Sequence, residues 1–572
     1  MHGVDLVLAV ADGEAVEAVE VDAGVPGRRH RVALGELPAW VAGQPESVRW
    51  VWADSAALYP RLLRAGVRVR RGVDLRLTRA LLRAAAAVRD TSYALAPGND
   101  WDAAPTDAAV PPEHVPSDPT LFDLASRGPG VDECVAEHVA QQECLAGAQD
   151  RGGLALLCHA ESVGGLIAQE LNHAGVPFSA EVHERRLTET LGERDPYGGR
   201  PAVLAQVCEQ VRAALDAPRL NPDSAVDIVA TLRRAGLEVT STRKGELARL
   251  DHPVVEPLLR YKKLSRLHTA NGWAWMESWV RDGRFRPDWV PGAVVTGRWA
   301  SRGGGALQLP REIRSAVRAD PGWRLVVADA AQLEPRVLAA MSGDEQMARA
   351  ASAGDLYQAL VDQGVVETRQ HAKVAMLGAM YGATTGEAGA LVPRLQRAYP
   401  RAVGLVEAAA RAGERGERVT TWLGRTSPWP SGWWRDAQAA AQQPGAGGAA
   451  ERRARQVSRD WGRFTRNFVV QGTAAEWALC WMGHLRRLLE ETARVGTAGG
   501  SGVHAGAAPD ARPELVYFLH DEVIVHAPEE LADEVAAAVA GAAAAAGELL
   551  FGSFPVEFPL DVAVVGSYDE AG

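Results

Sequence analysis

Two adjacent carboxylates interrupt an apolar run near the C-terminus. Asp521 and Glu522 stand at the centre of residues 515–526, LVYFLHDEVIVH, whose flanks are rich in β-branched and aromatic residues. Such flanks are typical of a strand or a tight hairpin in a sheet. Taking two neighbouring anions out of water costs on the order of several kcal/mol each. A hard divalent cation would offset that cost, because carboxylate oxygens are its preferred ligands.

A third carboxylate has a similar setting at a distant point in the sequence. Asp329 ends the apolar run WRLVVAD at residues 323–329 and precedes a turn into a helix-like stretch. If the fold brings Asp329 and Asp521 together, they could face two metal ions roughly 3.5–4 Å apart, the arrangement that promotes in-line displacement at phosphorus. The alternative is that Asp329 only caps the following helix, with Asp521 and Glu522 in an exposed turn.

Between these carboxylates, four side chains recur with a spacing of four: Arg369, Lys373, Leu377 and Tyr381. On an α-helix each such step returns to the same face with about 40° of drift, so they form one slowly winding stripe. The two cations would hold the phosphates of a nucleoside triphosphate. Leu377 would touch its sugar or base, and Tyr381 would lie near the template base. The alternative is a solvated basic edge on an ordinary amphipathic helix.

The bulk composition limits the class of protein. At 572 residues the chain exceeds what one hydrophobic core serves, so we expect more than one domain. A net charge of −11 argues against coating nucleic acid by bulk electrostatics, although a local basic cleft is compatible with it. The pattern predicts neither a signal peptide nor a membrane span. Five cysteines without a CxxC pair indicate a reduced, cytosolic compartment and no structural zinc.

The elements that must position these residues follow from the hydrophobic pattern. Residues 1–90 alternate short apolar runs with charged turns, which predicts an α/β unit. The Pro- and Asp-rich residues 96–119 predict a loop. The pattern then predicts mostly helices at 121–185 and 220–280, a mixed region at 292–343, helices at 344–416, a hairpin at 419–430 and a mobile low-complexity stretch at 437–450.

The order of the motifs resembles that of a known family. TGRW at 296–299, VVADAAQLEPRVLAAMSGDE at 326–345, RQHAKVAMLGAMYG at 369–382, RFTRNFVVQGTAAE at 463–476 and FLHDEVIV at 518–525 follow one another along the chain. This series resembles the family A DNA polymerases, the group of bacterial DNA polymerase I. The resemblance covers roughly residues 150–572 and includes all three signature motifs of the family.

The resemblance implies roles for individual residues. Asp329 and Asp521 would bind two Mg²⁺ ions, with Mn²⁺ as an alternative and Glu522 in support, and Lys373 would protonate the departing pyrophosphate. Glu334 matches the steric gate against ribonucleotides. The implied deoxynucleotide-binding residues are Arg369, Lys373, Leu377, Tyr381, Glu334, Gln332 and His520. The implied DNA-binding residues are Arg298, Gln308, Arg463, Asn467, Gln471, Lys262, Lys263 and Arg266.

The resemblance also implies a fold, a mixed α+β right hand. The thumb would span about 205–290, the palm about 291–345 and 465–572, and the fingers about 346–460, all within a polymerase domain at 151–572. Residues 1–150 resemble the α/β, ribonuclease H-like 3′–5′ exonuclease domain that accompanies these polymerases.

We expect this N-terminal domain to be degenerate and inactive as a nuclease. That nuclease needs four carboxylates around two metal ions, and only Asp54 matches one of them by position. The first predicted strand has no Asp-x-Glu, and residues 130–150 contain no Tyr-x-x-x-Asp.

One departure concerns the nucleotide site itself. Leu377 stands where the family usually has Phe or Tyr. By analogy with base–aromatic stacking, the loss of that ring weakens the contact with the incoming nucleotide by about 1–3 kcal/mol. Slow synthesis or altered sugar discrimination is the hypothesis that follows.

These observations lead to one expected function and two alternatives. The expected function is a DNA-directed DNA polymerase in DNA repair or replication, acting as a cytoplasmic monomer on primer–template DNA and deoxynucleoside triphosphates, without a membrane partner. One alternative is a catalytically weakened protein that binds primer–template DNA. The other is the related single-subunit RNA polymerase architecture, which Glu334 and the segment QGTAAE at 471–476 disfavour.

Overall fold

The computed structural model describes most of the chain. The described residues are 4–11, 13–102, 128–303, 305, 309–352, 354–383, 386–498 and 512–571. Most of the loop predicted at 96–119 and the predicted DNA contact Gln308 lie outside these residues.

The N-terminal unit is built on a five-stranded sheet with the order β3-β2-β1-β4-β5. Its strands β1, β4 and β5 are parallel to one another, and β2 and β3 are antiparallel additions. The elements are β1 (Asp5–Val10), β2 (Ala15–Asp22), β3 (Val25–Ala33), α1 (Leu37–Ala42), β4 (Arg49–Trp52), α2 (Ser55–Arg64), β5 (Gly72–Asp74), α3 (Leu75–Ala84), α4 (Ser92–Leu95) and α5 (Val131–Ala146). The α/β pattern predicted for residues 1–90 is confirmed.

A second, antiparallel sheet carries the predicted carboxylates. Its order is β12-β13-β11-β14, with β11 (Trp323–Ala330), β12 (Glu514–Leu519), β13 (Glu522–Pro528) and β14 (Leu560–Val565). Strand β11 pairs with β13 along its length, although nearly 200 residues separate them. Apolar side chains such as Val326 and Ile524 are fully buried between the sheet and its helices. The sheet therefore joins two distant parts of the chain.

Two long helices lie against this second sheet. They are α20 (Gly448–Ala498) and α21 (Ala532–Phe551), which pack on each other. Among the described residues, one helical stretch, Glu529–Phe551, is long and apolar enough by length and composition to cross a membrane. Val535 and Val539 of this stretch are buried in the core that includes the sheet.

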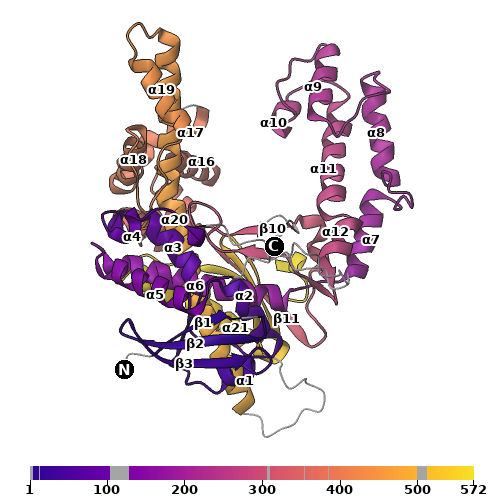
Figure 1. Ribbon diagram of the computed structural model, residues 1–572. Coiled ribbons are helices and arrows are strands. Elements are labelled where there is room, and N and C mark those ends of the chain that lie inside the picture. The colour runs from indigo at the N-terminus through magenta and orange to yellow at the C-terminus, as the bar shows by residue number, and fades with distance from the viewer. Residues whose placement is uncertain are drawn as a thin grey trace, which may run out of the picture.

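Two helical arms rise from this sheet on opposite sides (Figure 1). One arm contains α8 (Ala202–Ala214), α9 (Ala225–Arg234), α10 (Lys244–Leu247) and α11 (Val255–Asn271), above α7 (Ala180–Leu191) and α12 (Trp273–Trp279). The other contains α14 (Glu345–Ser352), α15 (Leu356–Asp362), α16 (Arg369–Tyr381), α17 (Gly386–Ala398), α18 (Pro400–Glu414), α19 (Gly432–Gln442) and the first part of α20. Short strands β6 (Val176–Pro177), β7 (Val280–Arg281), β8 (Arg284–Phe285), β9 (Asp288–Val290) and β10 (Ala300–Arg302) complete the base, and α13 (Leu333–Ser342) follows β11.

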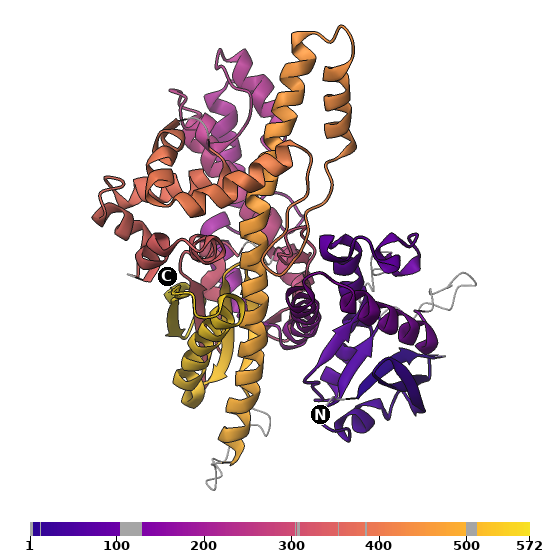
Figure 2. The ribbon, with the colours of Figure 1, turned by 90° about the vertical axis from the view of Figure 1, so that its left-hand side faces the viewer.

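Helix α6 (Arg151–Ala174) connects the N-terminal unit to the rest of the chain. It packs on α2, α3 and β5 on one side and on α20 on the other. Buried Arg486 of α20 donates to Glu170 of α6 at 2.7 Å and to the carbonyl oxygen of Val69 at 2.6 Å. Figure 2 shows the N-terminal unit beside α20. The N-terminal unit is therefore fixed to the body by buried polar contacts.

Two segments with predicted local structure have the following conformations. The stretch predicted to be mobile at 437–450 is helical over 437–442, at the end of α19, and again from the start of α20. Alanine has the highest helix propensity, and Gln438 anchors α19 by donating to Ser458 Oγ at 3.0 Å. The hairpin predicted at 419–430 is present as a short turn, in which an antiparallel bridge joins Thr420 and Thr426 and the Ser427 amide donates to the Val419 carbonyl oxygen at 2.9 Å.

Candidate active site

The second sheet brings the predicted carboxylates together. Asp329 lies opposite Glu522 in the β11–β13 register. Strands β12 and β13 form a tight hairpin in which Leu519 faces Glu522, so His520 and Asp521 make the turn. The amide of Ala330 donates to the Asp521 carbonyl oxygen at 2.8 Å. Residues almost 200 positions apart therefore share one edge of the sheet.

The carboxylates at this edge are partly buried and lie near other negative charges. The side chain of Asp329 reaches solvent, yet the surrounding walls partly desolvate it, and this burial, followed by the negative charges of Asp521 and Asp561, raises its pKa to about 6. Burial likewise raises the pKa of Asp521 to about 6. Burial raises the pKa of Glu522, which also accepts a hydrogen bond from Tyr568 Oη at 2.8 Å.

This arrangement fits a divalent cation. Both aspartates present oxygen donors, and burial, the largest cause of their raised pKa values, opposes the charged form when no cation is bound. The described residues contain no group of three or more His, Cys, Asp or Glu side chains that could by itself hold a metal ion. Mg²⁺ is commonly held by one or two carboxylates while water and substrate phosphates complete its shell. Asp329 and Asp521 would therefore hold the ion together with its substrate.

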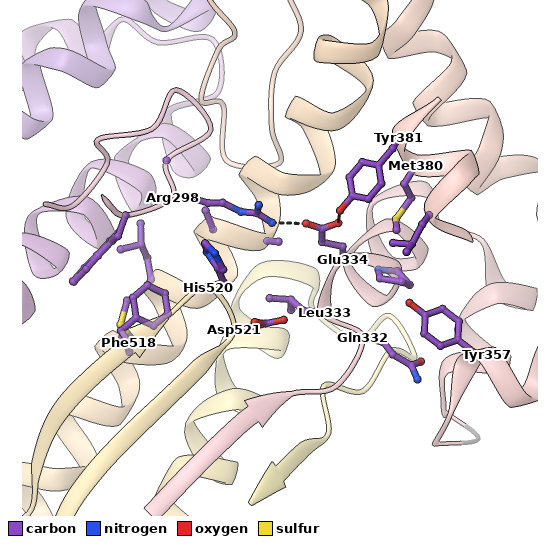
Figure 3. Close-up of a pocket in the computed structure, with 18 residues that line it drawn as sticks. Arg298, Gln332, Leu333, Glu334, Tyr357, Met380, Tyr381, Phe518, His520 and Asp521 are labelled. Atoms are coloured by element: carbon purple, nitrogen blue, oxygen red, sulfur yellow. Dashed lines mark hydrogen bonds and ion pairs between the residues drawn. The ribbon is translucent and has the colours of Figure 1, made fainter. Parts of the chain in front are cut away.

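Glu334 joins three elements above this edge. It lies in the first turn of α13, accepts a hydrogen bond from Arg298 Nη2, and accepts another from Tyr381 Oη of α16 at 2.6 Å. Burial and the hydrogen bond to Glu334 raise the pKa of Tyr381 well above its usual value. Figure 3 shows this Arg298–Glu334–Tyr381 chain beside Asp521 and His520.

A cavity of about 240 Å³ opens between these groups. Its lining includes Asp521, Glu334, Tyr381, Leu377 and Tyr357 (Figure 3). The charged part of the lining comes from three places: Asp521 in the β12–β13 turn, Glu334 of α13, and Arg298. Helices α15 and α16 contribute the aromatic and apolar side chains of Tyr357, Leu377 and Tyr381.

Arg369 is engaged in a contact that sequence reasoning did not find. Its Nε donates to Asp355 Oδ2 at 2.6 Å. Asp355 also caps α15 through the Tyr357 amide at 2.9 Å and accepts from Gln332 Nε2 at 2.8 Å. One carboxylate thus holds two predicted nucleotide-binding side chains, Arg369 and Gln332. The only available signal was an aspartate before a helical run, the usual pattern of an N-cap.

The other residues of the α16 stripe lie as the helical spacing predicts. Thr368 caps α16 by accepting from the His371 amide at 3.1 Å. Lys373 is exposed one turn beyond Arg369, Leu377 is half-buried at the cavity, and Tyr381 ends the helix.

The predicted DNA contacts fall into two groups. Arg463, Asn467 and Gln471 follow one another along α20, and a side-chain hydrogen bond links Gln471 to Tyr381 beside the cavity. His520 is exposed in the β12–β13 turn with a positive φ of 56°. Arg298 and His520 line the cavity with Asp521, and Gln471 reaches it through Tyr381, whereas Arg463 lies beside Gly382 at the end of α16.

The thumb residues lie elsewhere, on α11. Lys262 Nζ donates to Thr242 Oγ1 at 2.7 Å, and Lys263 forms a 2.6 Å ion pair with Glu312. Arg266 is exposed on the same helix. None of the three lines the cavity.

The predicted nuclease site of the N-terminal unit is largely apolar. Ala9, near the end of β1, packs in one cluster with Val51 and Cys134. Asp54 caps α2 by accepting from the Ala56 amide at 2.8 Å. Buried Asp74 accepts from Ser55 Oγ at 2.8 Å, and burial, followed by the charge of Asp54, raises its pKa to about 7.

Comparison with known proteins supports a relationship. A family model described as DNA polymerase family A matches residues 219–569. The thermostable DNA polymerase I of Thermus filiformis is 27% identical over 443 residues, covering 72% of this chain and 46% of the relative. DNA polymerase I of Chloroflexus aurantiacus is 28% identical over 340 residues, covering 54% of this chain and 32% of the relative. The chain thus spans less than half the length of either relative.

A solved structure shares the fold. The POL domain of Pol1 from M. smegmatis, in complex with DNA primer-template and dNTP, matches with a TM-score of 0.66 at 18% sequence identity. The match covers 99% of this chain and 95% of that chain, so it extends over the N-terminal sheet as well as the two arms.

Proposed function

The chain belongs to DNA polymerase family A, and we propose that it is a DNA-directed DNA polymerase that adds deoxynucleotides to the 3′ end of a primer. The observation that carries this proposal is the meeting of Asp329 and Asp521 at one sheet edge, beside a cavity closed by α16. Burial raises the pKa of both carboxylates, and a divalent cation would stabilise their charged forms where a triphosphate would be attacked.

We infer a role for each residue from its position in the site. Asp329 and Asp521 would hold Mg²⁺, which activates the primer hydroxyl and neutralises charge on the leaving group. Arg369 and Lys373, one helical turn apart, would bind the triphosphate, and the exposed Lys373 would give a proton to the departing pyrophosphate. Glu334 stands over the cavity where a ribose 2′-hydroxyl would lie.

Binding requires one ion pair and one hydrogen bond to rearrange. Arg369 must exchange Asp355 for a phosphate, and Tyr381 must leave Glu334 when α16 moves toward the nascent pair. The Arg369–Asp355 ion pair is exposed and therefore weak. A correct base pair would supply the free energy for this closure, which gives selectivity by induced fit.

We assign the remaining parts by the same reasoning. Residues 1–150 form a nuclease-like unit without nuclease activity, and 151–572 form the polymerase, with α8–α11 as the thumb, α14–α18 as the main body of the fingers and the second sheet in the palm. We propose primer–template DNA and deoxynucleoside triphosphates as partners, Mg²⁺ as the cofactor, and action in the bacterial cytoplasm as a monomer.

Primer extension tests the proposal against its alternatives. The wild-type protein should extend a primed template only with Mg²⁺ and deoxynucleotides, and Asp521→Ala should bind the same DNA without extending it. Binding without extension by both proteins would identify a primer–template binding protein. Preferential extension with ribonucleotides would identify the RNA polymerase alternative.

A further inference from the structure

A short loop carries Arg298 into the active site. Residues 291–298 lead from β9 to β10 and close on themselves. The Val294 amide donates to the Arg298 carbonyl oxygen at 3.1 Å, and the Gly297 amide donates to the Val294 carbonyl oxygen at 2.7 Å. Val294 and Val295 are exposed, so the outer side of this loop faces solvent. The position of Arg298 therefore depends on what lies against the inner side of the loop.

A buried ion pair lies against that inner side. Arg425 Nη2 donates to Glu161 Oε2 at 2.7 Å, and the two side chains are 10% and 2% exposed. Glu161 belongs to α6, whereas Arg425 lies in the 419–427 segment, 264 positions later in the sequence. We call Glu161 and Arg425 the anchor pair.

Two glycines allow the loop backbone to rest on the anchor pair. A Cβ atom at Gly297 would lie 2.5 Å from Arg425 Nε, and one at Gly292 would overlap Glu161 Oε1. Both glycines have a positive φ, 60° at Gly292 and 85° at Gly297, which other residues rarely adopt. Each member of the anchor pair thus occupies the space that a side chain of the loop would fill.

Helix α6 supports the ends of the loop as well. Gly164, one turn after Glu161, lies close to both flanking residues, since a Cβ atom there would lie 3.4 Å from Trp299 and 3.8 Å from Pro291. Trp299 is buried. Packing on α6 thus fixes both ends of the loop, and the anchor pair supports the backbone between them.

The segment that carries Arg425 is itself held from two sides. The Leu423 amide donates to Glu476 of α20 at 3.0 Å. The Ala86 amide of the N-terminal unit donates to Thr426 Oγ1 at 2.9 Å, and Leu423 packs in a cluster with residues of α3 and α5. The N-terminal unit and α20 together therefore determine where the Arg425 guanidinium lies.

We propose that Glu161 and Arg425 are positioning residues, which hold the loop so that Arg298 stays beside Glu334 and Asp521. Arg298 Nη2 donates to Glu334 and lines the cavity with Asp521, whereas neither member of the anchor pair lines it. The anchor pair thus acts on the site through the loop. This inference rests on the proposed polymerase function, because it takes Arg298 to act on the primer–template.

Hydrogen exchange of the peptide 291–299 measures the loop without requiring activity. The double variant Arg425→Met/Glu161→Met removes both charges together, so neither is left buried without its partner. Its loop amides should exchange at least about tenfold faster than those of the wild type. Arg425→Lys keeps a charge beside Glu161 but lacks the guanidinium under Gly297, and it should show faster exchange of the same peptide.

The conservative variant Glu161→Gln should restore the wild-type behaviour. Its amide oxygen still accepts a hydrogen bond from Arg425, so both loop exchange and the rate of incorporation should stay within about twofold of wild type. Fast exchange in Glu161→Gln would contradict a role that depends on the position of Arg425.

Single-turnover incorporation shows whether the anchor pair acts through Arg298. Arg425→Met/Glu161→Met should lower the rate at saturating nucleotide at least about tenfold, as should Arg298→Ala. Adding Arg298→Ala to the double variant should lower the rate little further, because coupled residues are not additive. Losses that multiply would mean that the anchor pair serves only stability, and they would overturn the inference.

The Arg486–Glu170 ion pair is the matched control. It is also buried and also joins α6 to the body, but it lies against the Val69 carbonyl oxygen instead of the loop. Arg486→Met/Glu170→Met should leave both loop exchange and the incorporation rate within about twofold of wild type.

Two failures can be told apart. Unchanged loop exchange in Arg425→Met/Glu161→Met and in Arg425→Lys would overturn this inference alone, even if the wild-type protein extends primers. A wild-type protein that does not extend primers would overturn the polymerase proposal, and the positioning role with it, whatever the loop exchange shows.

Discussion

At the scale of single residues, Leu377 is the main departure from the family pattern. It is half-buried and lines the cavity opposite the carboxylates. Replacing it with Phe would restore a ring that a bound base can contact, a gain of about 1–3 kcal/mol. We predict that kcat/KM for nucleotide incorporation by Leu377→Phe rises at least about fivefold.

Steady-state kinetics on a primed template measures this effect. Leu377→Met is the matched control, because it keeps the volume without adding a ring. An unchanged kcat/KM in Leu377→Phe would show that the nucleotide does not contact this side chain.

Asp355 is the residue that sequence reasoning missed, and it yields a second prediction. Asn at this position would still cap α15 and accept from Gln332. It would have no negative charge to form an ion pair with the Arg369 guanidinium. Exposed ion pairs contribute about 0.2–1 kcal/mol. We therefore predict that Asp355→Asn lowers the nucleotide KM by about two- to fivefold, with kcat unchanged.

The control for this variant lies on the same helix. Asp362→Asn removes a carboxylate that accepts only from Gln358, at 2.9 Å, among the hydrogen bonds of the described residues, so KM should stay at the wild-type value. A higher KM in Asp355→Asn would mean that Asp355 orients Arg369 for the phosphate instead of competing with it.

The sequence predicted which residues form the site better than it predicted the contacts between their side chains. Residue type and spacing were sufficient for the α16 stripe and for the carboxylates, because periodicity and burial cost act locally. The Asp355–Arg369 pair and the Glu334–Tyr381 bond depend on how α13, α15 and α16 pack. No pattern within any one of these helices encodes that packing.

At the scale of elements, apolar runs predicted strands within residues 1–90 and at β11, β12 and β13, whereas β14 was not predicted. The tight β12–β13 hairpin follows from two carboxylates between apolar strands. Helix forms at both ends of 437–450 because this low-complexity segment is rich in alanine, which favours helix as soon as a neighbouring helix is available. The strand order of the second sheet could not be predicted from local sequence patterns, because β11 and β13 are far apart in sequence.

Buried Glu476 of α20 gives a prediction about how the 419–427 segment is attached. It accepts from the Leu423 amide at 3.0 Å and from Thr421 Oγ1, and burial raises its pKa to about 7. Between about pH 4.5 and 7 the folded state holds a proton that the unfolded chain releases, so the free energy of unfolding falls as pH rises. We predict a loss of up to about 3 kcal/mol from this group across that window.

Denaturant unfolding of wild type and Glu476→Gln at pH 5 and pH 8 checks this prediction. The Gln amide can accept from Leu423 and donate to Thr421, yet it does not titrate. The variant should therefore lose less stability than wild type between the two pH values. Equal losses would show that Glu476 keeps the same protonation state in both.

At the scale of the whole molecule, we propose that the N-terminal unit has the fold of the nuclease without its activity, since only Asp54 matches that nuclease's carboxylate pattern by position. Ala9 and Cys134 pack in an apolar cluster near the end of β1, and Asp54 is used as a helix cap. We predict that a primer with a mismatched 3′ end stays intact when incubated with the protein, Mg²⁺ and no nucleotides.

Gel analysis of the labelled primer over hours provides the measurement. The Asp54→Asn variant serves as the control for any slow loss, since it removes the one carboxylate that matches the nuclease pattern. Shortening of the primer by wild type but not by Asp54→Asn would contradict the prediction and reveal a working nuclease.

The central claim is that Asp329 and Asp521 act as one unit across the sheet edge. Single-turnover incorporation should be measured for Asp329→Asn, Asp521→Asn and the double variant, with the exposed Asp533→Asn of α21 as control. Each single variant should lose at least about a thousandfold in rate and the double variant little more, because residues that act as a unit are not additive. Wild-type rates in either single variant, or losses that multiply in the double variant, would contradict the account.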